Sequence, residues 1–276
     1  MSEIPPTTRR VPTSRAVDGA TVTVIMPAYN TEKYVGEAIS SVLSQTRRDF
    51  ILHVHDDGST DGTLEAALSV SDDRCLVTSS TNQGVSAARN LAIGMARTPF
   101  IALMDSDDHS LPDRLEGQLN YLAEHPEVAV VGGRLTLFGD AAESDTWWQP
   151  SLTGNESWTE LLWRTACGAG ACAGRIDAFR AVPFDPTLRL AEDYDWECRL
   201  ATAGAAIDVT DQVVLRYRRH GLNHSIEQAG EVVRATAEIR RKYGKSMLRG
   251  PGTDRFVDWL VWASSDFGPA IRDLTI

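Results

Sequence analysis

The chain has few cysteines and none of the spacings that are typical of a zinc site. Cys75, Cys167, Cys172 and Cys198 are scattered over its 276 residues, and no CxxC pair occurs. A zinc site is therefore not expected. The start of the chain does not read as a signal peptide, so we interpret the four as buried thiols in a reducing compartment, which predicts a cytoplasmic location.

Long apolar runs and an excess of basic residues are also missing. No stretch approaches the roughly 18 apolar residues of a membrane span, so we expect no transmembrane segment, with attachment to a membrane surface as the alternative. Acidic residues outnumber basic ones by 38 to 27, for a formal net charge of -11. General nucleic-acid binding, which needs a basic surface, is therefore not expected. A metal ion or a local arginine can override net charge, so small anionic substrates stay open.

What is present is enough for a sizeable core. Apolar residues make up 42% of the chain and charged residues 24%, as in ordinary globular proteins. This length predicts one large domain or two small ones. Residues 1–20 are rich in proline and polar residues, and we expect them to form a flexible tail.

From Thr21 onward, apolar runs alternate with segments of helical periodicity. Strands are predicted at 21–27, 50–55, 74–79, 99–104 and 127–133, and helices at 31–45, 61–70, 84–96 and 111–125. Such alternation predicts βαβ units, and hence an α/β fold with a mostly parallel sheet flanked by helices. Ligands of such sheets bind beyond the carboxyl ends of the strands.

The alternation stops after Gly139. A helix is predicted to begin near Glu192, followed by two short strands within 206–220 and helices at 225–243 and 254–267. The last helix has a broad aromatic face, which needs a cover. Packing on the chain's own core is one cover, and contact with a second copy in a homodimer is the alternative. A membrane surface ranks last, because Asp254, Asp258 and Asp266 stand where such a helix usually has basic residues.

Carboxylates gather where the predicted strand 99–104 ends. The stretch "FIALMDSDDHSLPDRL" places Asp105, Asp107 and Asp108 within four residues. Like charges so close repel each other, and a divalent cation is the simplest means of keeping them ionised. Mg²⁺ and Mn²⁺ take few protein ligands and share substrate phosphates, so this cluster suggests a diphosphate-bearing substrate. A capping loop, with Asp108 capping the next helix, is the alternative.

Two other strand ends carry polar segments of the same kind. "HDDGSTDGT" sets Asp56 and Asp57 after the second strand, where an aspartate can accept a hydrogen bond from a nucleobase or a ribose. "PAYN" sets Tyr29 after the first strand, where a base could stack on it. A turn with a helix cap would explain the aspartates equally, and helix–sheet packing would explain Tyr29. Three such segments together are harder to explain by capping.

These motifs resemble the inverting family 2 glycosyltransferases with the GT-A fold. The resemblance rests on "VTVIMPAYN", "VHDDGSTDGT", "NQGVSAARNLAIGMA", "PFIALMDSDD", "AEDYDW" and "YRRHGLNHS", and spans Thr21 to Ser225. It implies a Rossmann-like GT-A domain at 21–225, with a nucleotide-binding half at 21–139 and an acceptor and catalytic half at 140–225. Residues 226–276 then form a C-terminal helical extension.

The resemblance also implies roles for matching residues. The nucleotide pocket would contain Pro27, Ala28, Tyr29, Asn30, Glu32, Asp56, Asp57, Arg89, Asp105 and Ser106. Within it, Asp57 would contact uracil or its equivalent and Arg89 would lie near the nucleotide sugar. An ion pair between helix and loop is the alternative for Arg89. Asp105 would approach the ribose and the metal, Mn²⁺ or Mg²⁺, with Asp107 as the firmest metal ligand.

Inverting transfer also needs a base and a stabilised leaving group. "LAEDYDWECRL" offers Glu192 and Asp193, and the resemblance implies Asp193 as the base. A charged first turn of a helix is the alternative. Asp195 is interpreted as structural, and Trp196 as either a pocket wall or a core residue. His220 is expected to reach the metal or the diphosphate, with a structural role as the alternative.

Three functions are weighed from these residues. The first is metal-dependent transfer of a sugar, from a nucleoside diphosphate sugar with UDP favoured, to an acceptor hydroxyl. A sugar chain, lipid carrier, protein or small natural product would all fit as acceptor, as in cell-envelope or polysaccharide synthesis. The second is a sugar-phosphate nucleotidylyltransferase, disfavoured because "PAYNTEKY" replaces the basic glycine-rich loop expected there. The third is a non-catalytic subunit that binds nucleotide sugars.

Overall fold

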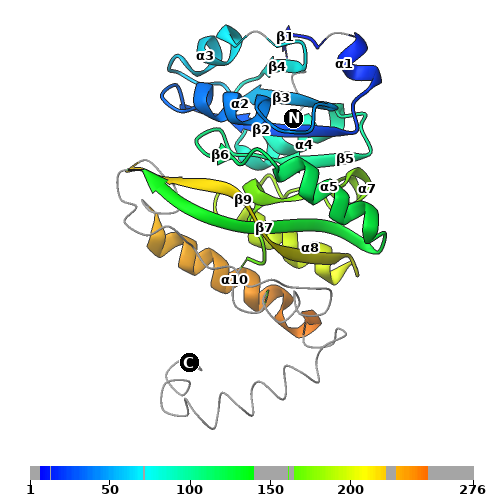
Figure 1. Ribbon diagram of the computed structural model, residues 1–276. Coiled ribbons are helices and arrows are strands. Elements are labelled where there is room, and N and C mark those ends of the chain that lie inside the picture. The colour runs from blue at the N-terminus through cyan, green and yellow to red at the C-terminus, as the bar shows by residue number, and fades with distance from the viewer. Residues whose placement is uncertain are drawn as a thin grey trace.

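The computed structural model describes residues 7–12, 14–70, 72–139, 161, 165–221 and 228–247. Within these residues the protein is an α/β fold built on one mixed sheet in the order β1-β4-β3-β2-β5-β8-β7-β9-β6 (Figure 1). The predicted α/β class with a mostly parallel sheet is confirmed.

The first half of the sheet has a centre of four parallel strands. These strands are β2 (Val22–Ala28), β3 (Phe50–Asp56), β4 (Cys75–Ser79) and β5 (Phe100–Leu103). The helices between and after them are α2 (Val35–Leu43), α3 (Thr63–Ser69), α4 (Val85–Met95) and α5 (Arg114–Glu124). Each predicted element exists, with ends displaced by a few residues. The first strand continues one residue beyond its predicted end, to Ala28, and Pro27 is paired with His55.

The N-terminal segment is not wholly a tail. β1 (Thr7–Arg10) pairs antiparallel with β4 at the edge of the sheet, and α1 (Ser14–Asp18) follows it. The prediction of a flexible tail over residues 1–20 is therefore wrong for these two elements. The edge of β4 offers unpaired backbone groups, and such an edge can pair with a strand of little hydrophobic character.

The second half of the sheet mixes directions. β8 (Ala173–Arg175) lies antiparallel between β5 and the long strand β7 (Val128–Gly139). β9 (Ala206–Arg219) runs parallel to β7 and carries the two-residue β6 (His109–Ser110) at its other edge. The two short strands predicted within 206–220 are thus one strand. Its register against β7 shifts at the polar residues that lie between its two apolar parts.

Helices of the second half cover the long strands. The short helix α7 (Ile176–Ala181) is followed by α8 (Glu192–Thr202), and α10 (Ala229–Met247) packs against α8 beneath β7 and β9 (Figure 1). Tyr243 of α10 donates a hydrogen bond to Asp195 of α8 over 3.1 Å. Within the described residues no helix is both long and apolar enough to cross a membrane. The helix predicted at 254–267 lies outside the described residues.

The core has two parts, one on each face of the sheet. Alternate residues of β2 belong to different parts of the core. Val24 and Met26 pack with α2, whereas Ile25 packs with residues of α4 and α8. Side chains of a strand alternate between faces, and helices cover both faces here, so a continuous apolar run is needed. This is why the predicted strands read as unbroken apolar segments.

Candidate functional site

The polar segments after β2, β3 and β5 meet at one edge of the sheet. The backbone N–H of Asn30 donates to Ser59 Oγ over 3.1 Å, and the N–H of Thr60 donates to Asn30 Oδ1 over 2.9 Å. The hydroxyls of Thr31 and Ser106 lie 3.0 Å apart. Parallel strands place their carboxyl ends together, and these contacts show that the three segments meet there.

The first segment has both buried and exposed members. Ala28 is buried within β2, whereas Tyr29 is 42% exposed at its end. Asn30 has a φ of 52°, a left-handed conformation that asparagine tolerates better than most residues. Glu32 Oε2 accepts the N–H of Gly62 over 3.1 Å and so ties this segment to the one after β3. An exposed ring on a fixed backbone is what base stacking requires.

Asp57 holds two loops together. Its carboxylate accepts the N–H groups of Gln83 and Gly84 over 2.9 and 2.7 Å, so it holds the turn that leads into α4. Gly84 has a φ of 93°, which favours glycine at this turn. Burial raises the pKa of Asp57, and the two N–H donors oppose that rise. Asp56 is also buried and accepts the N–H of Ser59 over 3.3 Å.

Arg89 of α4 joins the segment after β5 to α8. Its Nη2 donates to Asp105 Oδ1 and its Nη1 to Glu192 Oε1, each over 2.9 Å. The Arg89 side chain is only 4% exposed. Burial alone would lower the pKa of Arg89, but the two carboxylates outweigh it and raise the pKa. The ion-pair alternative for Arg89 is thus what the structure shows.

His220 and Arg218 close the other side of the Asp105–Asp108 loop. His220 Nε2 lies 3.0 Å from Asp107 Oδ2, and the imidazole stacks on Tyr34 with ring centroids 4.5 Å apart. Arg218 braces the loop, since its Nε donates to the Asp107 carbonyl over 2.7 Å and its N–H to Asp108 Oδ1 over 2.8 Å. Asp108 therefore holds β9 rather than capping α5.

The loop after β5 concentrates negative charge in a buried place. Burial and the charge of Asp105 raise the pKa of Asp107, against the hydrogen bond from His220. Burial and Asp107 raise the pKa of Asp108, whose Oδ2 is buried without a hydrogen-bond partner. Carboxylate oxygens under mutual repulsion fit Mg²⁺ or Mn²⁺, which need only one or two carboxylates beside phosphates.

The predicted ligands do not form a closed metal cage. Asp107 and His220 are brought together, whereas Asp105 is paired with Arg89. Among the described residues, three ligand atoms all within 4.8 Å of one another occur in a different group, Cys167, Cys172 and Glu197. The strand-end site therefore fits an open ion site completed by substrate.

Glu192 and Asp193 begin α8 at this site. Ala191, which precedes them, has a φ of 55°, a strained conformation for a residue other than glycine. Asp193 Oδ1 accepts the N–H of Tyr194 over 2.7 Å. Burial and the adjacent Glu192 carboxylate raise the pKa of Asp193 to about 6. A carboxylate with such a pKa is suited to take a proton near neutral pH.

The next residues of α8 serve packing. Asp195 accepts the Nε–H of Arg199 over 2.6 Å, which agrees with its structural interpretation. Trp196 is fully buried, and its ring stacks on Phe179 and Phe184 with centroids 5.0 and 4.8 Å away. Of the two interpretations of Trp196, the core role is the one observed.

Two residues near the site escaped the sequence reasoning. Glu197 accepts backbone N–H groups of the loop before β8, and Gly170 of that loop is so close to Asp105 that an added Cβ would lie 2.6 Å from Asp105 Oδ2. Both contacts join segments far apart in sequence. The run of small residues in "CGAGACAG" was the available signal, and it left two interpretations, the approach of a sugar to the backbone and the close packing of two elements.

The comparison with known families decides the relationship. The model of "Glycosyl transferase family 2" matches residues 23–182, more than half of the chain. This chain belongs to glycosyltransferase family 2. The predicted family and enzyme class are confirmed at that level, and the nucleotidylyltransferase alternative is set aside.

Relatives and solved structures agree with the family. EpsE of Bacillus subtilis (strain 168) is 39% identical over 126 residues, which are 44% of this chain and 45% of EpsE. The Escherichia coli protein WfgD is named as a UDP-Glc:alpha-D-GlcNAc-diphosphoundecaprenol beta-1,3-glucosyltransferase. It is 32% identical over 179 residues, 64% of this chain and 68% of WfgD. The chain thus spans less than half of EpsE.

Two solved structures share the GT-A fold. S. aureus TarS 1–349, solved with UDP-GlcNAc, has a TM-score of 0.63 at 22% identity, over 86% of this chain and 75% of that one. The mannosyltransferase PcManGT of Pyrobaculum calidifontis, solved with GDP-Man and Mn²⁺, has a TM-score of 0.58 at 21% identity. That match covers 75% of this chain and 59% of PcManGT. The predicted GT-A architecture is confirmed.

Proposed function

We propose that this protein transfers a sugar from a nucleoside diphosphate sugar to an acceptor hydroxyl by single displacement with inversion. The observation that carries the proposal is the Arg89 bridge. It joins Asp105, in the carboxylate segment of the donor side, to Glu192, next to Asp193. A base of suitable pKa is thereby held beside the place proposed for the donor.

The donor is proposed to lie across the ends of β2, β3 and β5. Tyr29 is exposed there for stacking on the base, and the Asp56 and Asp57 carboxylates retain lone pairs for base or ribose N–H and O–H groups. The names and complexes of relatives include UDP-Glc and UDP-GlcNAc as well as GDP-Man. We favour a UDP-sugar for this chain.

Asp107, with His220 beside it, is proposed to hold Mn²⁺ or Mg²⁺. When bound, such an ion would neutralise charge on the diphosphate leaving group. Arg218 keeps this loop in place by its contacts with Asp107 and Asp108. Asp105 then contributes to the donor side while Arg89 compensates its charge.

Asp193 is proposed as the general base, with Glu192 holding it in the site through Arg89. A carboxylate oxygen of Asp193 takes the proton of the acceptor hydroxyl as that oxygen bonds to the anomeric carbon. The bond from the anomeric carbon to the diphosphate oxygen breaks on the opposite face, which inverts the configuration. Glu192 also keeps the pKa of Asp193 high, so that this base accepts a proton near neutral pH.

A donor panel tests the proposal. The purified protein is incubated with UDP-Glc, UDP-GlcNAc, UDP-Gal and GDP-Man in Mn²⁺ and with candidate acceptor sugars, and released nucleoside diphosphate is measured. We expect release with at least one UDP-sugar. Asp177 is exposed on α7, so Asp177→Asn is a control that should retain release.

Donor binding distinguishes an enzyme from the remaining alternative, a non-catalytic subunit that binds nucleotide sugars. A subunit without catalysis would be stabilised by UDP-sugars in thermal unfolding yet release no nucleoside diphosphate with any acceptor. Release by wild type that is lost in Asp193→Asn supports catalysis at this site. Equal release by both proteins would contradict the assigned base.

A further inference from the structure

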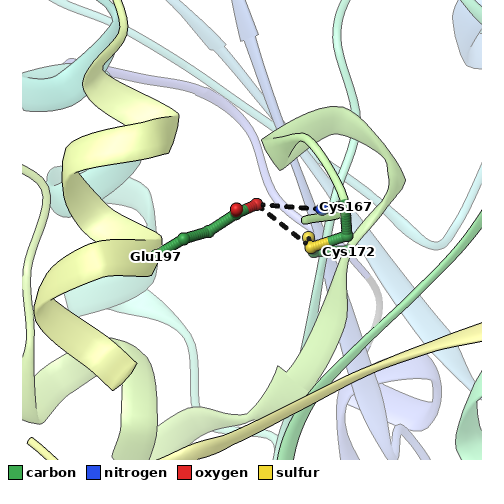
Figure 2. A group of neighbouring side chains, drawn as sticks. All are labelled: Cys167, Cys172 and Glu197. Carbon is green, nitrogen blue, oxygen red and sulfur yellow. Dashed lines mark hydrogen bonds between the residues drawn. The ribbon is translucent and has the colours of Figure 1, made fainter. Parts of the chain in front are cut away.

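A second cluster of reactive side chains lies behind the proposed donor site. Cys167 and Cys172 flank the turn η1 (Ala169–Ala171), and Glu197 of α8 points at them (Figure 2). All three side chains are buried. The Sγ atoms of the two cysteines lie 2.6 Å apart. None of the roles proposed above uses this cluster.

Each thiol has an oxygen acceptor besides the other sulfur. The Cys167 thiol donates to Glu197 Oε1 over 3.2 Å, and the Cys172 thiol donates to the Gly168 carbonyl over 3.0 Å. The sulfurs lie 2.6 Å apart, closer than unbonded sulfur atoms normally approach and toward the roughly 2.05 Å of a disulfide bond.

A metal ion fits this cluster less well. Two thiolates on one tetrahedral zinc ion, each about 2.3 Å from it, would lie roughly 3.8 Å apart. Glu197 is also occupied, because its carboxylate accepts backbone N–H groups of Ala166 over 2.6 Å and Gly168 over 3.1 Å. The geometry thus favours a bond between the sulfurs over shared coordination of a cation.

We propose that Cys167 and Cys172 form a dithiol–disulfide pair, a redox modification site that closes the loop between them. With hydrogen peroxide as oxidant, the Cys167 proton passes to Glu197 and the thiolate attacks one peroxide oxygen. The O–O bond breaks, giving a sulfenic acid and a hydroxide that takes the proton from Glu197 to become water. The Cys172 sulfur then displaces the sulfenic oxygen, which leaves as a second water. Two thiols lose two electrons in all.

Glu197 makes this chemistry accessible inside the protein. The contact with Cys172 and burial raise the pKa of Cys167, so its thiolate does not form readily unaided. Burial and the charge of Asp193 raise the pKa of Glu197 to about 7. A carboxylate of that basicity within hydrogen-bonding distance of the thiol is a suitable proton acceptor.

The bond would act on the loop that touches the donor side. Gly170 lies between the two cysteines, against Asp105. A ring closed at Cys167 and Cys172 restricts this loop, and cross-linking removes conformational freedom chiefly from the unfolded chain. We expect the oxidised protein to show a Tm higher by a few degrees and slower amide hydrogen exchange at residues 168–171.

The test is peptide mass spectrometry after controlled oxidation. Trypsin cleaves after Arg164 and Arg175, so both cysteines fall in one peptide. The full-length protein is treated with hydrogen peroxide, alkylated under denaturing conditions and digested. We expect this peptide to escape alkylation and to lose the mass of two hydrogen atoms, with reversal by dithiothreitol. Cys198→Ser should behave as wild type, and Cys167→Ser should show no such peptide.

Two results would overturn the proposal. In one, both cysteines stay alkylatable while Cys75 or Cys198 becomes oxidised. In the other, the purified protein contains about one equivalent of zinc that Cys167→Ser lacks, which would make the cluster a metal site. Glu197→Gln separates the proposed proton acceptor from the pair itself, since it should slow oxidation of the pair at least tenfold while dithiothreitol-reversible closure remains.

Discussion

At the scale of single residues, Asp193 carries the chemistry of the proposed reaction. Its pKa of about 6 predicts that kcat/KM rises tenfold per pH unit below that value and levels off above it, because only the carboxylate accepts the proton. Asp193→Asn keeps the size and removes the acceptor. We expect transfer to fall about 10²–10⁴-fold with donor affinity nearly intact, as measured by steady-state kinetics and titration calorimetry.

The controls decide between a base and a binding residue. Asp177→Asn should keep the pH profile of the wild type. An Asp193→Asn protein that lost donor binding but kept its turnover would place Asp193 in the donor site instead.

Asp107 tests the metal requirement. Removing its carboxylate takes away the proposed ligand that faces His220. We expect Asp107→Ala to abolish transfer. We also expect that UDP with Mn²⁺ no longer raises the Tm of this variant, as measured by thermal unfolding with and without UDP and with and without Mn²⁺. Asp73 is exposed away from the site, so Asp73→Ala should match wild type. Full wild-type activity in excess EDTA would rule out the metal.

Residue types at strand ends were predictable because their chemistry is local. The carboxylates of Asp105, Asp107 and Asp108 follow an apolar strand, so their place could be predicted from sequence order alone. Their partners could not. Arg89 is 103 positions from Glu192, and only the folded chain shows which carboxylates share its guanidinium.

At the scale of elements, the Arg89 bridge fastens α4 and the end of β5 to α8. Removal of the guanidinium leaves Asp105 and Glu192 without their shared cation. Breaking a buried pair costs about 3–5 kcal/mol, and we expect the lower end because Asp105 is 34% exposed. We therefore expect Arg89→Met to lower the free energy of unfolding by about 3 kcal/mol, measured by urea unfolding, and to abolish transfer.

Charge and shape are separable at this bridge. Arg89→Lys keeps the charge, but an ammonium group cannot reach both carboxylates as the guanidinium does. We therefore expect a loss of stability and of transfer that lies between those of wild type and Arg89→Met. Arg97 is exposed near the end of α4, and Arg97→Met serves as the control. Stability of Arg89→Met equal to wild type would show that the bridge is dispensable.

The order of elements followed from periodicity, but their pairing did not. β2 to β5 have apolar runs that any reading of the sequence identifies. β8 has three residues, and its place between β5 and β7 depends on contacts more than 40 residues away. β1 contains two threonines and two arginines, and its pairing reflects the open edge of β4 rather than its own composition.

At the scale of the whole molecule, buried ionisable groups set opposing dependences on pH. Burial lowers the pKa of His53 to about 3 and that of His55 to about 4, whereas a histidine of the unfolded chain has a pKa of roughly 6.5. Both histidines therefore add to the free energy of unfolding at pH values above roughly 6.5, and this contribution is lost on acidification. Burial raises the pKa of Asp193 to about 6 and that of Glu197 to about 7. Protonation of these two carboxylates on acidification therefore increases the free energy of unfolding. The wild-type curve alone cannot separate these contributions.

A variant of His53 isolates the contribution of this histidine to the free energy of unfolding. His53 Nε2 lies 2.8 Å from Thr78 Oγ1, and the amide of glutamine in His53→Gln can replace that contact without titrating. The variant should be less stable than wild type at pH 7.5. As the pH falls to 5.5, the unfolded wild-type chain takes up a proton at this histidine while the folded protein does not. The difference should therefore narrow by about 1.4 kcal/mol.

Urea unfolding of both proteins across this pH range measures that difference directly. Subtracting one curve from the other cancels the contributions of Asp193 and Glu197, because both proteins contain them. His125→Gln, which replaces an imidazole 41% exposed, is the control for histidine loss at the surface. A difference between wild type and His53→Gln that stayed constant with pH would mean that His53 takes up its proton inside the folded protein. Thr78 and His55 would then have to accommodate a buried imidazolium, which their contacts in this structure do not provide for.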